Sequence, residues 1–596
     1  MKVKKNNYTS KHILFDFYKT EKYSFLWLIL YMISSTSTPL LMAYMPKILI
    51  DSISNNVGIK YMIIKLLVFT VLIALTSWIS PCLEQQLSGA SQRMVIEYST
   101  KLFNKVMRIK IIDLESYSGR LQLEKASQFV EENENGVYDY LNIISEFLKG
   151  LLGLIATTVL LHEIPSVFLV IILLSAFIEF LLHYIECKYD KIVLDNNSNN
   201  LMSLNYFYRI SNNISAGKDI RSFSLYNLFA KLVNAAYKAY ENISKKHMNI
   251  SFILTLARTL LIFARDFIIY FQLGKMVYCK FIGVSDFVFL TGIVFGLSKN
   301  ISLIAYSCNR YSLFCYKYKN FFSFLNLVDD KEAYNVASKN EIKEDLILKL
   351  EHIYFKYNKN DNDTLKDISL EIKNGEKIAI VGENGSGKST LIKIICGLYA
   401  PTQGNILLNN VNSDFLNKEQ YYSIYSTVFQ DSIIYPTTIL KNITLSDNCD
   451  EKKLQDIIAK TEINQFICKL KNGIETKVGK ELFKDGVDLS GGEKQKIFIA
   501  RALYKDYEML IFDEPTSAMD AISELSIYEK YSQIAQNKPS IFITHRLNST
   551  RFCDRILLMQ NGKIIEQGTH EELMNCKGQY YDMFNTQSYY YKEENI

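Results

Sequence analysis

Long apolar runs fill the first half of the chain, whereas the part after about residue 340 has the shorter apolar segments typical of a soluble α/β domain. A membrane-spanning helix needs about twenty mainly apolar residues. The runs of that length are residues 24–46, 61–81, 141–163, 165–185, 250–273 and 284–306. The pattern predicts an α-helical membrane bundle with six spans over residues 1–310. A linker over 311–341, an α/β P-loop ATPase domain over 342–585 and a tail over 586–596 complete the predicted organisation.

The two long connections between these runs, residues 82–140 and 186–249, are compatible with helices and predict helical extensions beyond the bilayer. The short HEIP segment predicts a tight turn, with Pro165 starting the next helix. The N-terminal segment and the two long connections carry six, seven and nine basic residues, against four in the opposite loops. Basic residues stay on the cytoplasmic side, so both termini and both long connections are predicted to be cytoplasmic.

Composition excludes several classes of function. A formal net charge of +5 in 596 residues is too mild to indicate a nucleic-acid partner. The ten cysteines are scattered, without a CxxC pair or a Cys/His cluster, which disfavours a zinc site or a disulfide framework. The polar N-terminal segment lacks the short apolar region and cleavage site of a signal peptide, so no cleaved signal is expected.

A phosphate-binding loop lies in the second half of the chain. The stretch GENGSGKST (382–390) follows a predicted strand at 377–381 and precedes an apolar helix. This is the full GxxxxGK[ST] pattern, whose backbone N–H groups surround phosphate oxygens. The lysine reaches the β- and γ-phosphates of ATP, and the serine hydroxyl can bind Mg²⁺. The predicted nucleotide-binding residues here are Gly382, Asn384, Gly385, Ser386, Gly387, Lys388, Ser389 and Thr390.

A second predicted strand, 509–512, ends in Asp513 and Glu514. An acidic residue at the end of a strand beside a P-loop can hold the Mg²⁺ shell, and this is the role predicted for Asp513. Glu514 would then polarise the water that attacks the γ-phosphate.

The stretch LSGGEKQ (489–495) lies between these two motifs, and the set resembles the ATP-binding cassette (ABC) family over the whole chain. The layout is similar to that of a bacterial exporter-type half-transporter. The resemblance implies that Tyr357 stacks on adenine, Gln430 contacts Mg²⁺, and His545 contacts the γ-phosphate. It further implies ATP contacts from Ser490, Gly491, Gly492 and Asp520.

Other family features match less closely. Residues 217–223 and the region around 113–119 resemble the two cytoplasmic coupling segments. The signature ends in Glu493 where Gln is usual. Because Ser490 and the following glycine backbone supply the phosphate contact, activity is expected to survive this change. The stretch before the signature is longer than usual, which leaves the communication loop poorly defined around 478–481.

Family members sandwich ATP between the P-loop of one cassette and the signature of another, so a dimer is implied. Intact Glu514, His545 and LSGG favour a homodimer, and a heterodimer with a related half-transporter stays open. The implied activity is ATP-driven export across the bacterial cytoplasmic membrane by alternating access. A non-pumping regulator and an importer on the same scaffold are the alternatives. The substrate is left open among peptides, drugs and lipids.

Three charges interrupt the predicted fifth span, 250–273: Arg258, Arg265 and Asp266. The arginines are seven residues apart and share one helix face. Arg265 and Asp266 are adjacent and are not expected to pair, so Glu179, a second subunit or water would neutralise them. The arginines form interhelix ion pairs or lie in the cytoplasmic extension of the helix, or they line a translocation cavity that favours an anionic substrate.

Overall fold

The computed structural model describes residues 11–593, apart from 56–57, 133, 161–165, 331–345, 359–361, 417 and 515–537. The chain forms two compact units. The first, the helical unit, is Met1–Met107 with Asp113–Leu327. The second, the cassette unit, is Arg108–Ile112 with Val328–Ile596. The predicted turn at HEIP and the predicted contact residue Asp520 lie outside the described residues.

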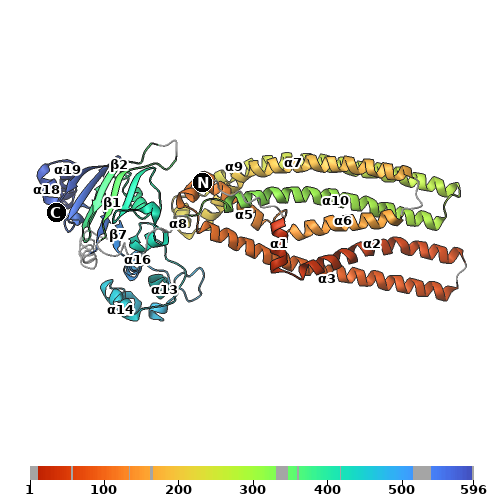
Figure 1. Cartoon of the computed structure of the whole chain (residues 1–596), viewed down its shortest axis with the longest axis horizontal. Helices are drawn as coiled ribbons and strands as arrows, with labels where there is room; N and C mark the ends of the chain where they lie inside the picture. The colour runs from red at the N-terminus through yellow and green to blue at the C-terminus, as the bar shows by residue number, and fades with distance from the viewer. Residues whose placement is uncertain are drawn as a thin grey trace. The chain divides into compact units, whose positions relative to one another are not determined.

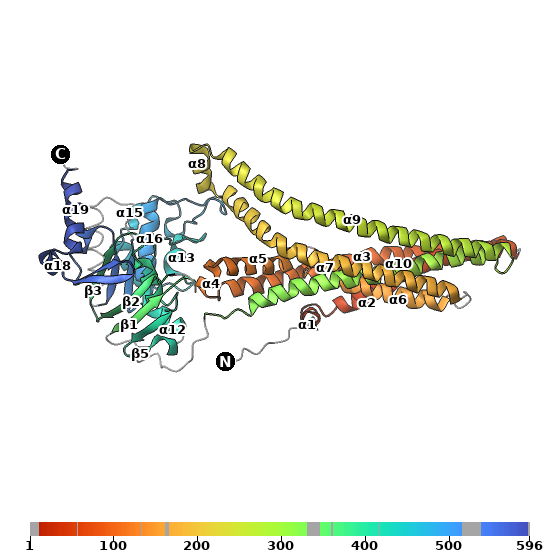
Figure 2. The same cartoon turned by 90° about the horizontal axis from the view of Figure 1, so that it is seen from above.

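The helical unit is built from very long helices (Figure 1). They are α1 (Lys11–Thr20), α2 (Ser24–Ser54), α3 (Ile59–Val106), α4 (Ile111–Glu115, shared with the cassette unit), α5 (Tyr117–Glu131), α6 (Tyr140–Leu160), α7 (Ser166–Ser211), α8 (Ile214–Ser222), α9 (Tyr226–Tyr278) and α10 (Val284–Leu325). Helices α3, α7 and α9 run far past the predicted spans, which confirms the predicted helical extensions. Figure 2 shows α8 as a short helix between the ends of α7 and α9.

Among the described residues, α2, α3, α6, α7 and α10 are long and apolar enough to cross a membrane. The predicted fifth span lies within the continuous helix α9, but its apolar run is interrupted by the three charges. Six spans therefore stay a prediction, five of which have a helix of suitable length and composition.

Helix α10 is the centre of the helical unit, packing against α2, α5, α6 and α7. Its buried face includes Phe289, Ile293 and Leu297, which pack with Ile269 of α9. By contrast, the apolar run of α3 is exposed, with Trp78 70% accessible. An apolar surface of this length is stable in lipid or against another protein.

The cassette unit contains two sheets, with strand orders β2-β1-β4-β5 and β10-β9-β3-β8-β7-β6. Their strands are β1 (Leu348–Phe355), β2 (Leu365–Ile372), β3 (Lys377–Gly382), β4 (Gln403–Leu408), β5 (Val411–Asn412), β6 (Tyr425–Val428), β7 (Met509–Asp513), β8 (Ser540–Ile543), β9 (Arg555–Gln560) and β10 (Lys563–Gly568). The first sheet is antiparallel. In the second, β6, β7, β8, β3 and β9 run parallel, so their carboxyl ends meet at one edge.

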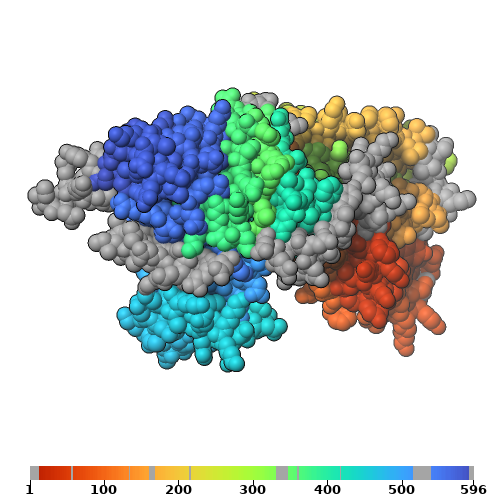
Figure 3. All heavy atoms as spheres, turned by 60° about the vertical axis from the view of Figure 1, so that its left-hand side comes forward, coloured from red at the N-terminus to blue at the C-terminus, as the bar shows by residue number. Residues whose placement is uncertain are grey.

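The helices of this unit are α11 (Lys388–Ile395), α12 (Lys418–Ile424), α13 (Ile439–Thr444), α14 (Glu451–Lys460), α15 (Asn464–Ile467), α16 (Gly491–Tyr504), α18 (His570–Cys576) and α19 (Gln579–Glu593). Helix α16 packs against α13 and α14. Figure 3 shows the α13–α14 segment, in cyan, as a lobe beside the green and blue surface of the sheets.

Two boundaries differ from the predicted ones. Helix α10 continues through the predicted boundary at 310 to Leu325, because Phe314, Phe321 and Phe324 extend its buried face. Helix α19 continues into the predicted tail as far as Glu593. The tail segment is therefore helical up to that residue.

Candidate functional site

The P-loop connects β3 to α11 through a backbone that favours glycine. Gly385 and Gly387 have φ values of 79° and 104°, in the left-handed region that is costly for other residues. A Cβ atom on Gly387 would lie 2.7 Å from Leu365 Cδ2, so a side chain has no room there. The loop that follows β3 thus turns its backbone tightly before α11 begins. This is the geometry in which backbone N–H groups can surround a phosphate.

Lys388 is held over this loop. Its Nζ donates to the carbonyl oxygens of Gly382 and Glu383, both at 2.9 Å. Burial lowers the pKa of Lys388, and the nearby carboxylates of Glu514 and Asp513 act in the opposite direction. These two bonds hold the ammonium group against the loop backbone.

Asp513, the last residue of β7, is buried beside the P-loop. Burial and the neighbouring Glu514 raise the pKa of Asp513 to about 6, while the Ser389 hydroxyl and Lys388 lower it. Its Oδ1 atom has no hydrogen-bond partner among the described residues. A buried carboxylate oxygen without a partner, close to a serine hydroxyl, is a donor set that fits Mg²⁺.

Glu514 brings together three of the predicted site residues. Its Oε1 pairs with His545 Nε2, and its Oε2 accepts a hydrogen bond from Gln430 Nε2 at 3.3 Å. Gln430 follows β6, Glu514 follows β7, and His545 follows β8, so the parallel sheet places them along one edge. Glu514 has a φ of 47°, a conformation that is uncommon for a glutamate and is often found at functional sites.

Tyr357 lies just beyond β1 and is connected to the P-loop helix. Its hydroxyl is 2.9 Å from Thr390 Oγ1. Its ring packs edge-on against Phe355 and Tyr399. Tyr357 is 41% exposed, so solvent reaches this side chain beside the P-loop helix.

The signature residues form the start of α16. Ser490 is the N-cap, and its side chain and that of Glu493 satisfy each other's backbone N–H groups in a capping box. Glu493 Oε2 also accepts a hydrogen bond from Ser490 Oγ at 2.8 Å. The unusual Glu493 is therefore accommodated structurally. In the described part of the chain the Ser490 side chain hydrogen-bonds only Glu493, and Gly491 and Gly492 are open to solvent contact.

Gln587 of α19 contacts the site, although no sequence pattern predicts this contact. Its Nε2 donates to the carbonyl oxygen of His545 at 2.7 Å, and its Oε1 accepts from Leu547 N at 3.0 Å. A glutamine in a predicted tail carries no motif, so only the folded chain reveals this contact.

The arginines of α9 are both paired within the helical unit, and one prediction about them is wrong. Arg265 Nε pairs with Asp266 Oδ1 at 3.0 Å, although the two residues are adjacent in the helix. Arg265 is 3% exposed and also contacts Ser298 of α10. Arg258 pairs instead with Glu186 of α7 at 2.7 Å. Neither arginine is paired with Glu179, the partner that the sequence suggested.

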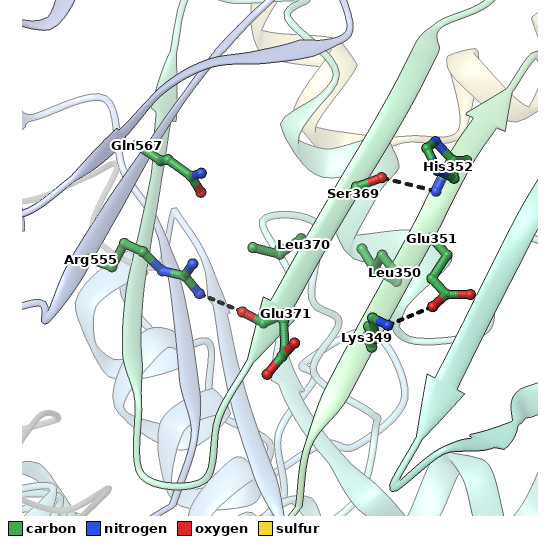
Figure 4. Close-up of a pocket in the computed structure, with 9 residues that line it drawn as sticks. All are labelled: Lys349, Leu350, Glu351, His352, Ser369, Leu370, Glu371, Arg555 and Gln567. Carbon is green, nitrogen blue, oxygen red and sulfur yellow. Dashed lines mark hydrogen bonds and ion pairs between the residues drawn. The ribbon is translucent and has the colours of Figure 1, made fainter.

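Two hollows stand out from the described surfaces. One lies in the cassette unit between β1, β2 and Arg555 of β9 (Figure 4). It contains an ion pair between Lys349 and Glu351 but none of the predicted nucleotide-binding residues. The other lies in the helical unit and is lined by Arg258 but not by Arg265.

Comparison with known proteins agrees with this geometry. Residues 365–517 match the family model described as ABC transporter. The nisin transport ATP-binding protein NisT of Lactococcus lactis is 27% identical over 565 residues, covering 91% of this chain and 90% of that protein. The putative multidrug export ATP-binding/permease protein YgaD of Bacillus subtilis is 36% identical over 255 residues, covering 42% of this chain.

Coverage of the relatives is uneven. The match spans 43% of YgaD and 41% of the mitochondrial iron-sulfur clusters transporter ABCB7 of Oryzias latipes, which is 31% identical. The solved structure of a bacterial Atm1-family ABC exporter with ATP bound aligns with a TM-score of 0.79. That alignment covers 95% of this chain and 98% of the exporter at 20% identity, which shows that the two share a fold.

Proposed function

We propose that the chain, which matches the ABC transporter family model over residues 365–517, is a half-transporter with one helical unit and one cassette, and that it couples ATP hydrolysis to export of a substrate across a bacterial cytoplasmic membrane. The observation that carries this proposal is the convergence of Gln430, Glu514 and His545 at the strand edge that also bears the P-loop.

Each residue then has a distinct role. The P-loop backbone and Lys388 bind the phosphates of ATP, and the exposed Tyr357 ring stacks on the base. Asp513, Ser389 and Gln430 would hold Mg²⁺, which neutralises charge on the phosphates when bound. Glu514 orients and polarises the attacking water, and His545 holds Glu514 and contacts the γ-phosphate. Water activation of this kind needs a carboxylate positioned before the reaction, which the contacts to Gln430 and His545 provide.

We further propose that two chains form the working transporter. In the described part of the chain the side chain of Ser490 bonds only within its own helix, so it is available to a nucleotide held by another cassette. Asp520, outside the described residues, would add a contact at the same interface. Closure of two cassettes on ATP and their reopening after hydrolysis would drive alternating access in the helical units.

The relatives' names do not converge on one substrate. They include a nisin transport protein, multidrug export proteins, a lipid A-core flippase and an iron-sulfur clusters transporter. Peptides, drugs and lipids therefore all remain candidate substrate classes, and the assignment of export as the direction rests on family membership.

The decisive experiment replaces Glu514. In the full chain reconstituted in lipid nanodiscs, Glu514→Gln should abolish phosphate release, by about a hundredfold or more, while ATP binding persists. Lys388→Ala should weaken ATP binding itself. Glu508→Gln serves as the control, because Glu508 lies just before β7 and pairs with Lys538 away from the P-loop. Near wild-type hydrolysis by the Glu514 variant would exclude the proposed mechanism, and absence of turnover in the wild type would favour a non-pumping regulator.

A further inference from the structure

A cavity of about 600 Å³ lies within the helical unit and is lined mostly by polar residues of α7, α9 and α10. Four of its lining residues come from one face of α7: Glu179, His183, Glu186 and Asp190. Their spacing of four, three and four residues places them above one another along the helix. A helix that qualifies as a membrane span thus turns a stripe of ionisable side chains towards an internal cavity, where such residues usually mark a functional site.

Most of the charges in this cavity are already neutralised. Arg258 donates to Glu186 through both terminal nitrogens, at 2.7 and 3.4 Å, and to His183 Nδ1 at 2.5 Å. His247 Nε2 is 2.6 Å from Asp190 Oδ1. Arg310 of α10 is bound to Glu146 at 2.8 Å and also to Asp139. Both arginines that line the cavity are therefore committed to carboxylates.

Glu179 is the exception. It is 2% exposed, and its Oε2 is enclosed without a hydrogen-bond partner among the described residues. A buried carboxylate without a partner is costly in its ionised form, and an adjacent cation offsets this cost. Among the described lining residues, the cavity thus contains one buried acidic group without a basic counterpart, Glu179, and one exposed one, Glu134, whereas both arginines are paired.

From this balance we infer that the cavity recognises a cationic group of the transported substrate, such as an ammonium group, through the Glu179 carboxylate. The inference rests on the proposed transport function and names the substrate class. An anionic substrate would have to displace Glu186 from Arg258, or Glu146 and Asp139 from Arg310. The serine and threonine hydroxyls on the adjoining face of α9, Ser251 and Thr255, supply further hydrogen-bond acceptors for an ammonium group.

The test measures binding without ATP, so that its outcome is independent of turnover. The full chain in nanodiscs is titrated with ethidium, a flat organic cation, and with fluorescein, an anion of similar size, and fluorescence anisotropy reports binding. Ethidium should bind the wild type at least tenfold more tightly than fluorescein does. Glu179→Gln should weaken ethidium binding at least tenfold, and Glu179→Asp, which keeps the charge, should restore much of it.

Glu97→Gln is the matched control. Glu97 of α3 also has an enclosed Oε2 without a partner among the described residues, but it pairs with Lys101 and does not line the cavity. This variant should bind ethidium as the wild type does. An octalysine peptide is then added as a competitor of ethidium. Displacement of ethidium would indicate that the cavity binds cationic peptides, whereas no displacement would indicate that it binds small cationic molecules.

Two results would overturn the inference. One is equal or tighter binding of fluorescein by the wild type, which needs no variant and stands even where Glu179→Gln fails to fold. The other is unchanged ethidium binding by a folded Glu179→Gln protein. Basal ATP hydrolysis is measured in parallel. Its absence in a wild type that still binds ethidium selectively contradicts the proposed transport function and leaves the cation site intact.

Discussion

Gln587 couples the C-terminal helix to the segment that carries His545. Its two hydrogen bonds fix the backbone on either side of Arg546, and the imidazole of His545 in turn contacts Glu514. Gln587→Ala removes both bonds, each contributing about 1 kcal/mol, and we expect the kcat for ATP hydrolysis to fall roughly fivefold or more. The dissociation constant of a fluorescent ATP analogue should not change, because the P-loop is untouched.

Thr586→Ala is the neighbouring control, since among the described residues the Thr586 hydroxyl donates only to Asp582 O within α19. A purely structural role for Gln587 would lower the melting temperature and leave kcat unchanged in the folded fraction. That pattern would contradict the positioning role.

The raised pKa of Asp513 predicts that metal binding at the ATP site depends on pH. Its pKa is raised to about 6, so the carboxylate is ionised above pH 7 and becomes protonated as the pH falls through 6. Metal ions bind the deprotonated form, so apparent Mn²⁺ affinity in the presence of ATP should fall about tenfold per pH unit below that pKa. Electron paramagnetic resonance of Mn²⁺ between pH 7.5 and 5 measures this. Asp513→Asn should lose the step while keeping the titration that belongs to ATP itself, and an identical pH profile in the two proteins would rule out Asp513 as the ligand.

Helix α16 depends on its capping box. Glu493 satisfies the backbone N–H of Ser490 at 2.7 Å, and a carboxylate in the first turn is favoured by the helix dipole. Glu493→Ala should cost about 1 kcal/mol locally and raise hydrogen exchange of the amides at the start of α16 roughly fivefold. Glu493→Gln should change exchange much less, because its side-chain oxygen can still accept. Mass spectrometry of the peptide around 488–497 measures both variants.

Helix α18 offers an internal control for this effect. Thr569 and Glu572 form the same capping box at its start. Glu572→Ala should accelerate exchange in α18 alone and leave ATP hydrolysis unchanged. Equal exchange at the start of α16 in the wild type and in Glu493→Ala would show that the box does not stabilise that helix.

The sequence pattern was sufficient to predict the elements that are determined by residues close together in the chain. The P-loop was predictable because the strand, the glycines at 385 and 387, Lys388 and the helix follow one another in the chain. The apolar runs likewise predicted the long helices. The ends of the helices were less predictable. Helix α10 continues to Leu325 because Phe321 and Phe324 are buried, and this burial depends on the surrounding helices.

Contacts between segments that are distant in the chain could not be predicted from the sequence. Gln587 and His545 meet across 42 residues without any motif to connect them. The pairing of Arg265 with Asp266 depends on a rotamer that helical spacing alone does not reveal. The stripe from Glu179 to Asp190 was not predicted, because its cavity forms only where α9 and α10 pack beside α7.

At the scale of the whole molecule, the proposed ATP site combines the P-loop of one chain with the signature of another, so it predicts that two copies are needed for activity. In Lys388→Ala the P-loop is defective and the signature intact, whereas Ser490→Ala has the reverse defect. A mixed dimer of these two variants contains one site with both parts intact and one with neither. Each variant alone should be nearly inactive, because every site of its homodimer lacks one part.

The two variants are co-expressed with different affinity tags, and mixed dimers are isolated by successive purification on both. Phosphate release by these dimers should recover to about half of the wild-type rate per dimer, since one of two equivalent sites is complete. Dimers of wild type and the Lys388→Ala, Ser490→Ala double variant are the control. In them each site lacks one part, so their activity should stay near that of the single variants. Recovery in this control, or none in the mixed dimers, would contradict a site shared between two identical chains and would point instead to a different partner subunit.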